Sequence, residues 1–359
     1  TSIKSPLRGR QPARLSKVFQ RCAREGTKET RHNAPCPSFR DPLRSDATPG
    51  PYRMTLVAHS KLPTFEILAR QGHDLLSFER AQRQDIRELH IGFLNMMPDA
   101  ALQATERQFI RLVGSCNRIA QFFVYPFSLP ELKRSPQTSD YIEQHYSRFE
   151  ELQAHGLDAL IITGANVANP DLSAEAFWSP LMNVVRWAQE NVASILCSCL
   201  ATHALLNHTH AIERQPLPGK RWGVYPHRLS DFGHPLVREI NTRFDVPHSR
   251  YNDISRAQLE ASGLQVLAES DQGGVHLAVS PDLARTVYFQ GHPEYDRNSL
   301  LKEYKREVRR YLAGARSDPP PEPENYFPDS ARALIEAAWR EPETLEQVLD
   351  EQVEPLLEN

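Results

Sequence analysis

Apolar and polar positions along the chain predict strands that alternate with helices. The segments with the apolar content of strands are LHIGFLNMM (89–97), QFFVYPFS (121–128), DALIITG (158–164) and ASILCSC (193–199). The segments with apolar residues at helical spacing are TERQFIRLVG (105–114), PLMNVVRWAQ (180–189) and LATHALL (200–206). Repeated strand and helix units predict an α/β fold in which helices sandwich a parallel sheet.

The last third of the chain changes its pattern. LQVLAES (264–270), GVHLAVS (274–280) and RTVYFQG (285–291) are typical of strands, with few helical residues between them. We therefore expect the sheet to extend or fold over here. SDPPPEPENYFP (317–328) breaks regular structure, and residues 330–358 resume a helical, acidic pattern.

The N-terminal end differs from the rest in composition. Residues 1–53 contain twelve Lys and Arg against four Asp and Glu, in a chain of net charge −3. They show no periodicity and too few apolar residues to form a core, which predicts a disordered basic extension. An organelle-targeting peptide or a nucleic-acid-binding arm would have this composition, but Met54 resembles a natural start, which favours an extension without function.

Composition narrows the remaining classes of protein. No apolar run approaches the roughly 18–20 residues of a membrane-spanning helix, and no secretory signal opens the chain. The 5 cysteines show no regular spacing, so we expect reduced thiols. A cytoplasmic protein with no membrane or nucleic-acid partner is predicted, with a main domain at 54–316 and a C-terminal segment at 317–359.

Cys199 stands where a predicted buried strand meets a predicted helix. Such a turn presents a nucleophile at the carboxyl edge of the sheet, and the N–H groups of the helix favour a thiolate and a developing oxyanion. The alternative is a buried core cysteine. Cys197, two positions earlier, would form a Cys-x-Cys pair for metal or redox chemistry, but no second pair accompanies it, and we expect no metal. We expect His203 to be either exposed to solvent or satisfied by hydrogen bonds.

A second feature is YFQGHPEYDR (288–297), in which a strand ends at a glycine. His292 and Glu294 point the same way if the segment is extended. This geometry permits a relay of Cys199, His292 and Glu294, in which the imidazole takes a proton and the carboxylate fixes its tautomer.

Three polar residues lie in contexts that read as turns: Lys220 in GKRWGVYPHR, Ser249 in VPHSRYND and Arg306 in EYKREV. Each would equally suit a solvated surface.

Six segments, in this order, resemble the homoserine O-succinyl/acetyltransferase family: LPTFEILARQG, ERAQRQDIRELHIGFLNMMP, DALIITGA, GVYPHR, VPHSRYND and GHPEYDR. The resemblance covers roughly residues 60–328 and implies a flavodoxin-like fold of the class I glutamine-amidotransferase type. It makes residues 54–316 the catalytic acyltransferase domain. One departure is MPDA (97–100), where the family usually has MPKK.

The resemblance also implies roles. Cys199 would hold the acyl group as a thioester, His292 would be the general base and Glu294 its support. Lys220, Ser249 and Arg306 match positions implied in substrate binding. Because an arginine can clamp a carboxylate, Arg306 suits the amino-acid carboxylate.

The implied reaction is a ping-pong acyl transfer from acyl-CoA to the hydroxyl of homoserine, in methionine biosynthesis and with no bound cofactor. In this family a glutamate after the TGA turn resembles acetyl users and a small residue resembles succinyl users. TGANVAN places Ala168 there, which favours succinyl-CoA over acetyl-CoA because a glutamate would repel the succinyl carboxylate.

Other hypotheses stay open from the sequence. Serine would be an alternative acceptor, since one methylene changes binding by only about 1–3 kcal/mol. A cysteine turn with His-x-Glu also occurs in amidotransferase-like hydrolases, and the altered MPDA loop would suit a catalytically silent binding protein. A homodimer is possible.

Overall fold

The computed structural model describes residues 56–358 apart from 117–119, 168, 239 and 283–284. The predicted extension 1–53 and Ala168 lie outside these residues. The strands are β1 (Val57–Ala58), β2 (Leu76–Ser77), β3 (Glu88–Leu94), β4 (Gln121–Phe127), β5 (Ala159–Ile162), β6 (Ser194–Ser198), β7 (Gln215–Leu229), β8 (Arg243–Asp253), β9 (Gln265–Ser270), β10 (Gly274–Val279) and β11 (Thr286–Phe289).

Helices connect and cover these strands. The α-helices are α2 (Pro63–Arg70), α3 (Phe78–Ala81), α4 (Asp99–Gly114), α5 (Pro136–His145), α6 (Phe149–His155), α7 (Trp178–Asn191), α8 (Leu200–His210), α9 (Arg256–Ala261), α10 (Ser299–Leu312), α11 (Asp329–Ala338), α12 (Leu345–Val348) and α13 (Glu354–Glu358). Short 3₁₀ turns η1 (Leu172–Ala174) and η2 (Pro342–Thr344) and a π-helical turn η3 (Leu349–Val353) complete the list. In the described part of the chain, no helix is long and apolar enough to cross a membrane.

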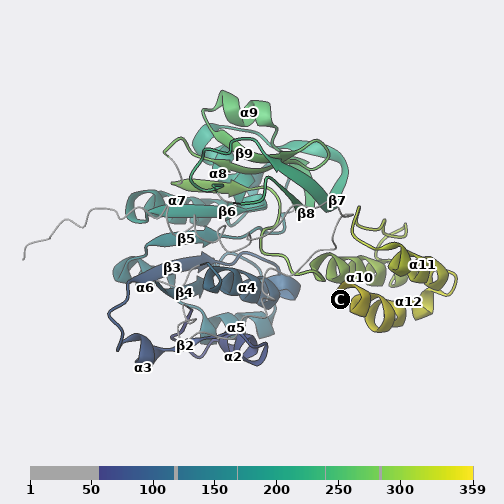
Figure 1. Cartoon of the computed structure of the whole chain (residues 1–359), viewed down its shortest axis with the longest axis horizontal. Helices are drawn as coiled ribbons and strands as arrows, with labels where there is room; N and C mark the ends of the chain where they lie inside the picture. The colour runs from purple at the N-terminus through teal and green to yellow at the C-terminus, as the bar shows by residue number, and fades with distance from the viewer. Residues whose placement is uncertain (1–55, 117–119, 168, 239, 283–284, 359) are drawn as a thin grey trace, which may run out of the picture.

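One large mixed sheet dominates the described residues (Figure 1). Its nine strands have the order β4-β3-β5-β6-β11-β10-β9-β7-β8. The first five are parallel to one another, because helical crossovers join most of them. The other four pair antiparallel, since short turns link β9, β10 and β11. The predicted α/β sandwich is confirmed, and the expected extension of the sheet is its antiparallel half.

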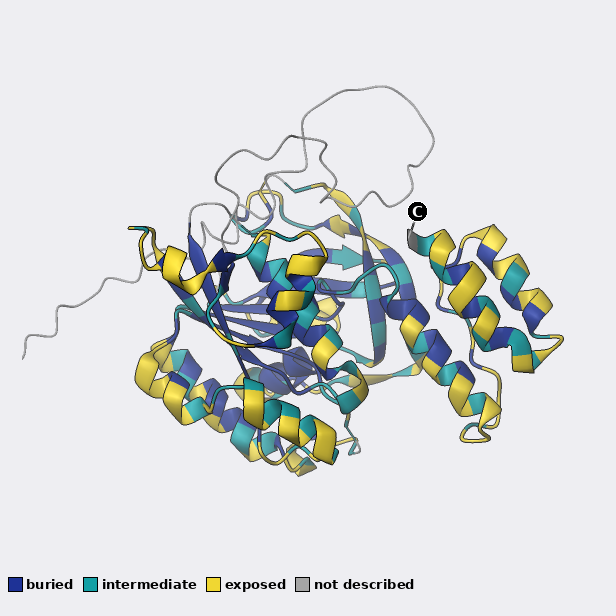
Figure 2. Ribbon diagram, turned by 90° about the horizontal axis from the view of Figure 1, so that it is seen from below, coloured by how far each residue is buried: buried dark blue, intermediate teal, exposed yellow. Residues whose placement is uncertain are grey.

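Helices cover both faces of the parallel half. Ile195 and Cys197 of β6 point into an apolar cluster with α7 and α8, whereas Leu196 points into a cluster with α2 and α4. This alternation follows from the two-residue period of a strand. The helices are buried on their inner faces and exposed on their outer faces (Figure 2).

The long hairpin of β7 and β8 was not predicted. Lys220 lies on β7 and Ser249 on β8, so the interpretation of their surroundings as turns was wrong. Prolines explain the error: Pro216 and Pro226 lie within β7, and Pro247 lies within β8. Because proline is usually a sign against a strand, the sequence did not indicate either strand.

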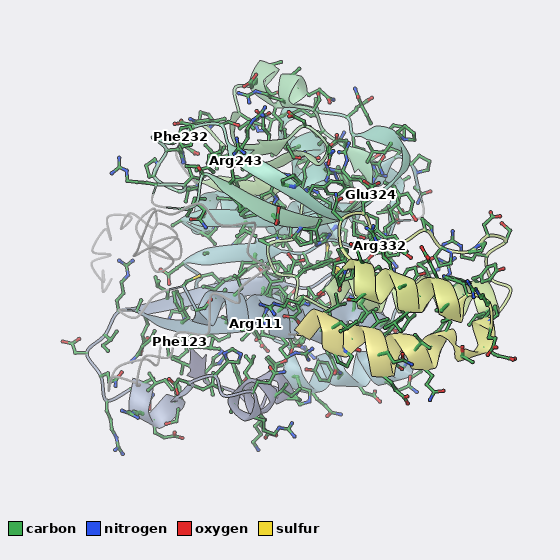
Figure 3. All side chains as sticks on the ribbon, turned by 45° about the vertical axis from the view of Figure 1, so that its right-hand side comes forward. Arg111, Phe123, Phe232, Arg243, Glu324 and Arg332 are labelled. Carbon is green, nitrogen blue, oxygen red and sulfur yellow. The ribbon has the colours of Figure 1, made fainter. Side chains whose placement is uncertain are left out.

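The C-terminal helices pack on α10. Leu301 and Tyr304 of α10 share a buried apolar cluster with Ile335 of α11 and Leu349. The segment before α11 also binds β7 through Glu324, which Figure 3 labels: its N–H donates to the Trp222 carbonyl over 2.8 Å. Gly223 allows this approach, because a Cβ there would lie 2.2 Å from the Glu324 carbonyl oxygen. The division into three parts at 53 and 316 stays a prediction.

Candidate active site

Cys199 alone connects β6 to α8. Its backbone has φ 53° and ψ −113°, a conformation that side-chain-bearing residues rarely adopt. The Cys199 N–H donates to the Phe289 carbonyl of β11 over 2.8 Å, which fixes the turn. The side chain is partly exposed. The turn thus presents a reachable thiol at the carboxyl edge of the parallel strands.

Cys197 lies in a different environment. It is fully buried against α7 and α8, and burial raises the pKa of its thiol. A thiol that stays protonated is a poor nucleophile. No group of three or more metal-type ligands occurs among the residues that the structure describes.

His292 and Glu294 follow the end of β11. The imidazole Nδ1 lies 2.8 Å from Glu294 Oε1, and both side chains are buried. Burial alone lowers the pKa of His292, but the charge of Glu294 and the charge and hydrogen bond of Cys199 outweigh burial and raise its pKa well above the ordinary value. The three side chains therefore lie together, and the imidazole is a strong proton acceptor.

The turn after β5 borders the thiol. A Cβ built on Gly164 would lie 3.6 Å from the Cys199 Cβ and 3.7 Å from the Leu200 nitrogen. Leu200 occupies the first position of α8, where an N–H has no preceding helical carbonyl to bind. Its N–H is therefore a candidate donor to an oxyanion formed on an acyl group attached to Cys199.

A partly buried carboxylate, that of Glu303 on α10, lies among polar residues beside the imidazole. Lys220 Nζ and Ser249 Oγ lie 2.8 Å and 2.7 Å from Glu303 Oε2, and the Tyr295 hydroxyl donates to Oε1 over 2.7 Å. The Tyr295 ring stacks on the His292 ring at 4.1 Å between centroids. Burial alone raises the pKa of Glu303, but Lys220 and the two hydroxyls outweigh it and lower the pKa, so the carboxylate is charged.

Arg306 lies outside this cluster. It follows Glu303 by three positions on α10, its side chain is 48% exposed, and its Nε lies 3.3 Å from Glu307. The structure thus brings together Lys220 and Ser249 but, among the described residues, leaves Arg306 at the surface.

Most of the chain, including the segments that form this site, matches a known protein family. A family model described as homoserine O-succinyltransferase matches residues 55–346. The chain belongs to the homoserine O-succinyltransferase family. The resemblance read from the sequence motifs is thereby confirmed.

Members of this family are highly similar over most of the chain. A homoserine O-succinyltransferase of Allochromatium vinosum is 61% identical over 282 residues, 79% of this chain and 79% of the relative. One of Thiobacillus denitrificans is 56% identical over 308 residues, 85% of this chain and 88% of the relative. Among solved structures, a glutamine amidotransferase from Thermotoga maritima has a TM-score of 0.41 and 14% identity, covering 76% of this chain and 99% of that one.

Sequence reasoning missed Tyr295 and Glu303. Tyr295 lies within GHPEYDR, so the motif contained a signal. Glu303 carries none, because it lies in a charged helical segment and its partners Lys220 and Ser249 lie 83 and 54 positions away.

Proposed function

We propose that the chain transfers a succinyl group from succinyl-CoA to the hydroxyl of L-homoserine through a thioester on Cys199. The observation that carries this proposal is a partly exposed thiol in a strained turn beside a buried His292–Glu294 pair. This arrangement suits covalent acyl transfer.

In the first half-reaction the Cys199 sulfur attacks the thioester carbonyl of succinyl-CoA. The carbonyl becomes an oxyanion, and the Leu200 N–H at the start of α8 donates to it. The bond from carbon to the CoA sulfur then breaks, and the protonated His292 donates its proton to the leaving thiolate. Succinyl-Cys199 and CoA result.

In the second half-reaction His292 takes the proton of the homoserine hydroxyl. The hydroxyl oxygen attacks the succinyl carbonyl, and the bond to the Cys199 sulfur breaks. Glu294 holds the imidazole by the 2.8 Å contact at Nδ1, which leaves Nε2 for both proton transfers. O-Succinyl-homoserine leaves, and the enzyme returns to its starting state. We propose that this product serves methionine biosynthesis.

Homoserine carries an ammonium and a carboxylate that the site must recognise. The charged, partly buried Glu303 suits the ammonium, and Lys220, which lies 2.8 Å from it, suits the carboxylate. Ser249 helps to place the substrate. Arg306, one turn along α10, has an exposed guanidinium that would add a second cation to the carboxylate.

Succinyl-CoA is the proposed donor because the relatives compared above are all described as homoserine O-succinyltransferases. The family resemblance assigns donor choice to position 168, and an alanine there, unlike a glutamate, has no negative charge to repel the succinyl carboxylate.

Steady-state kinetics with both substrates varied test the proposal. Parallel double-reciprocal lines, with O-succinyl-homoserine as the product in a mass spectrum, are expected. Acetyl-CoA and serine serve as competing substrates. If product formed with acetyl-CoA and not with succinyl-CoA, the protein would be an acetyltransferase. Release of ammonia from glutamine would indicate a hydrolase.

We further propose a cytoplasmic homodimer. Neither Cys197 nor Cys199 forms a disulfide with another described residue, as is usual in a reducing compartment. An apolar cavity of about 300 Å³ lies between α4 and the side chains of Leu236 and Phe244. It is also lined by Ile161, Leu196 and Phe289, and it suits burial against a second copy. Sedimentation equilibrium tests this: a dimer mass supports the proposal, and a monomer mass at micromolar concentration contradicts it.

A further inference from the structure

The first turn of α8 is fastened to the end of β11. The Cys199 N–H and the Thr202 hydroxyl both donate to the Phe289 carbonyl, over 2.8 Å and 2.7 Å. One residue further on each element, His203 Nε2 lies 3.0 Å from Gln290 Oε1. Because Cys199 begins this turn and His292 lies two residues beyond Gln290, these contacts join the helix of the nucleophile to the strand of the base.

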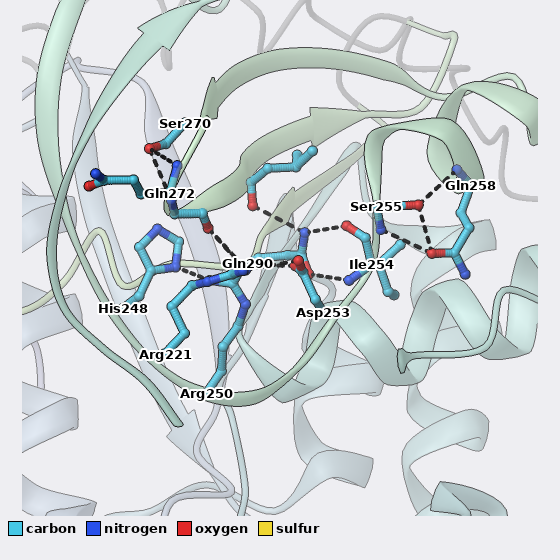
Figure 4. Close-up of polar contacts among 12 residues, drawn as sticks. Arg221, His248, Arg250, Asp253, Ile254, Ser255, Gln258, Ser270, Gln272 and Gln290 are labelled. Carbon is cyan, nitrogen blue, oxygen red and sulfur yellow. Dashed lines mark hydrogen bonds and ion pairs between the residues drawn. The ribbon is translucent and has the colours of Figure 1, made fainter. Parts of the chain in front are cut away.

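The Gln290 side chain is held on every polar atom (Figure 4). Its Nε2 donates to the Ile254 carbonyl over 2.9 Å and to the Val275 carbonyl over 3.1 Å. Its Oε1 accepts the Ile254 N–H over 2.9 Å. The amide therefore has one orientation, and its oxygen faces His203. Since that oxygen only accepts, His203 Nε2 carries the hydrogen and donates it.

His203 is buried as well, and burial lowers its pKa to about 4. The imidazole is therefore neutral near pH 7 and takes no part in proton transfer. An apolar side chain at position 203 would lose less free energy on leaving water than an imidazole does. A buried polar pair is favourable only when each of its polar atoms has a hydrogen-bond partner. A satisfied polar pair fixes one geometry, whereas apolar packing tolerates small shifts.

The end of β11 is also confined from the side. A Cβ on Gly291 would lie 2.6 Å from Val246 Cγ1 and 2.8 Å from His276 Nδ1. The His292 N–H donates to the Pro247 carbonyl over 3.0 Å. The base is thus fixed relative to β8, and the contact between the His203 and Gln290 side chains, together with that of the Thr202 hydroxyl, links this rigid segment to the helix of Cys199.

We propose that His203 and Gln290 form a positioning pair that sets the separation between the Cys199 sulfur and the His292 imidazole. The inference rests on the roles proposed for Cys199 and His292. Neither residue of the pair touches the reacting atoms; each acts through the element that it holds.

Two variants at one position separate positioning from packing. Glutamine in His203→Gln reaches the Gln290 oxygen with its side-chain amide, whereas the shorter side chain in His203→Asn does not. We expect His203→Asn to lower kcat about 10–100-fold, as displacements near 1 Å do, with KM for homoserine changed less than about 2-fold. His203→Gln should recover kcat to within about 3-fold of the wild type. His208→Gln, an exposed change on the same helix, should have no effect.

The alkylation rate of Cys199 by iodoacetamide, measured against pH, is the second readout. A displaced imidazole stabilises the thiolate less, so the midpoint of alkylation should move to higher pH in His203→Asn and not in His203→Gln. Alkylation needs no substrate, so this result is independent of whether succinyl-CoA is the donor.

A wild-type kcat and a wild-type alkylation midpoint in His203→Asn would overturn the inference, whatever the melting temperature. If this variant does not fold, His203→Leu replaces it, because leucine fills the buried space without binding the Gln290 amide. His203→Leu must then show the same loss of kcat, and full activity would leave the pair a purely structural role.

Discussion

Cys199 adopts a backbone conformation that costs a residue with a side chain on the order of 1–3 kcal/mol. Such strain persists only where the surroundings fix it, and here the Phe289 carbonyl does so from β11. The result separates two cysteines that are only two positions apart. Cys199 is raised to the carboxyl edge of the sheet, whereas Cys197 is buried within an apolar cluster.

Glu303 gives the most direct prediction at this scale. In Glu303→Gln the proposed ammonium contact loses its charge, and a charge-assisted hydrogen bond contributes about 1.5–3 kcal/mol. We expect KM for homoserine to rise about 10–100-fold, while the rate of acyl-enzyme formation from succinyl-CoA stays the same. Steady-state and burst kinetics measure the two quantities.

Glu336→Gln, an exposed change on α11, is the control for the loss of one carboxylate. An unchanged KM in Glu303→Gln would show that Glu303 does not bind the amino-acid substrate. A loss of acyl-enzyme formation instead would indicate that Glu303 supports His292 through Tyr295.

Part of this site could be predicted from the sequence. Cys199, His292 and Glu294 stand at the ends of predicted strands, and the carboxyl ends of parallel strands meet at one edge. Glu303 could not be predicted, because the contacts that define it join α10 to β7 and β8 across long stretches of chain. Local periodicity contains no information about such pairs.

At the scale of elements, the segment from β11 to His292 depends on Gly291. Alanine there would place its Cβ within 3 Å of Val246 and His276. Such overpacking typically costs about 1–3 kcal/mol. We expect Gly291→Ala to lower the free energy of unfolding in urea by this amount and to lower kcat, since His292 must shift with its neighbour.

Gly219→Ala is the matched control, because nothing lies within 4 Å of a Cβ at Gly219. It should change neither the free energy of unfolding nor kcat. Wild-type stability and activity in Gly291→Ala would mean that the end of β11 is less confined than these distances indicate.

The elements themselves were predicted unevenly. The strands of the parallel half are continuous apolar runs, because both of their faces are buried, and this signal is strong. β8 is the edge strand of the sheet and β7 is its neighbour, and both carry prolines and charged residues, so the same signal is weak there. The segments that hold Lys220 and Ser249 were therefore misread as turns.

At the scale of the molecule, several histidines are buried and neutral: His203 on α8, and His227, His248 and His276 in the antiparallel half of the sheet. Burial lowers the pKa of His203 and of His227 to about 4, and lowers the pKa of His248 and His276 well below the ordinary value. In the unfolded chain the pKa of a histidine is about 6.5. Between about pH 6.5 and 4 the unfolded state therefore binds more protons, and stability falls as the pH falls.

We expect acid to destabilise the protein in this window, with His203 contributing on the order of 3 kcal/mol at pH 4. His292 acts in the opposite sense: its pKa is raised, so its contribution is complete below about 6.5 and is lost only as the pH rises through its folded value. Urea unfolding at pH 7 and pH 5 measures the change. His203→Gln should show a smaller loss than the wild type, and equal losses would contradict the assignment.

The central claim is that Cys199 carries the acyl group, and intact mass spectrometry tests it most directly. The protein is mixed with succinyl-CoA without homoserine, as wild type, as Cys199→Ala and as Cys197→Ala. We predict a single succinyl adduct on the wild type and on Cys197→Ala that homoserine discharges, and no adduct on Cys199→Ala. An adduct that persists in Cys199→Ala and disappears in Cys197→Ala would contradict the account.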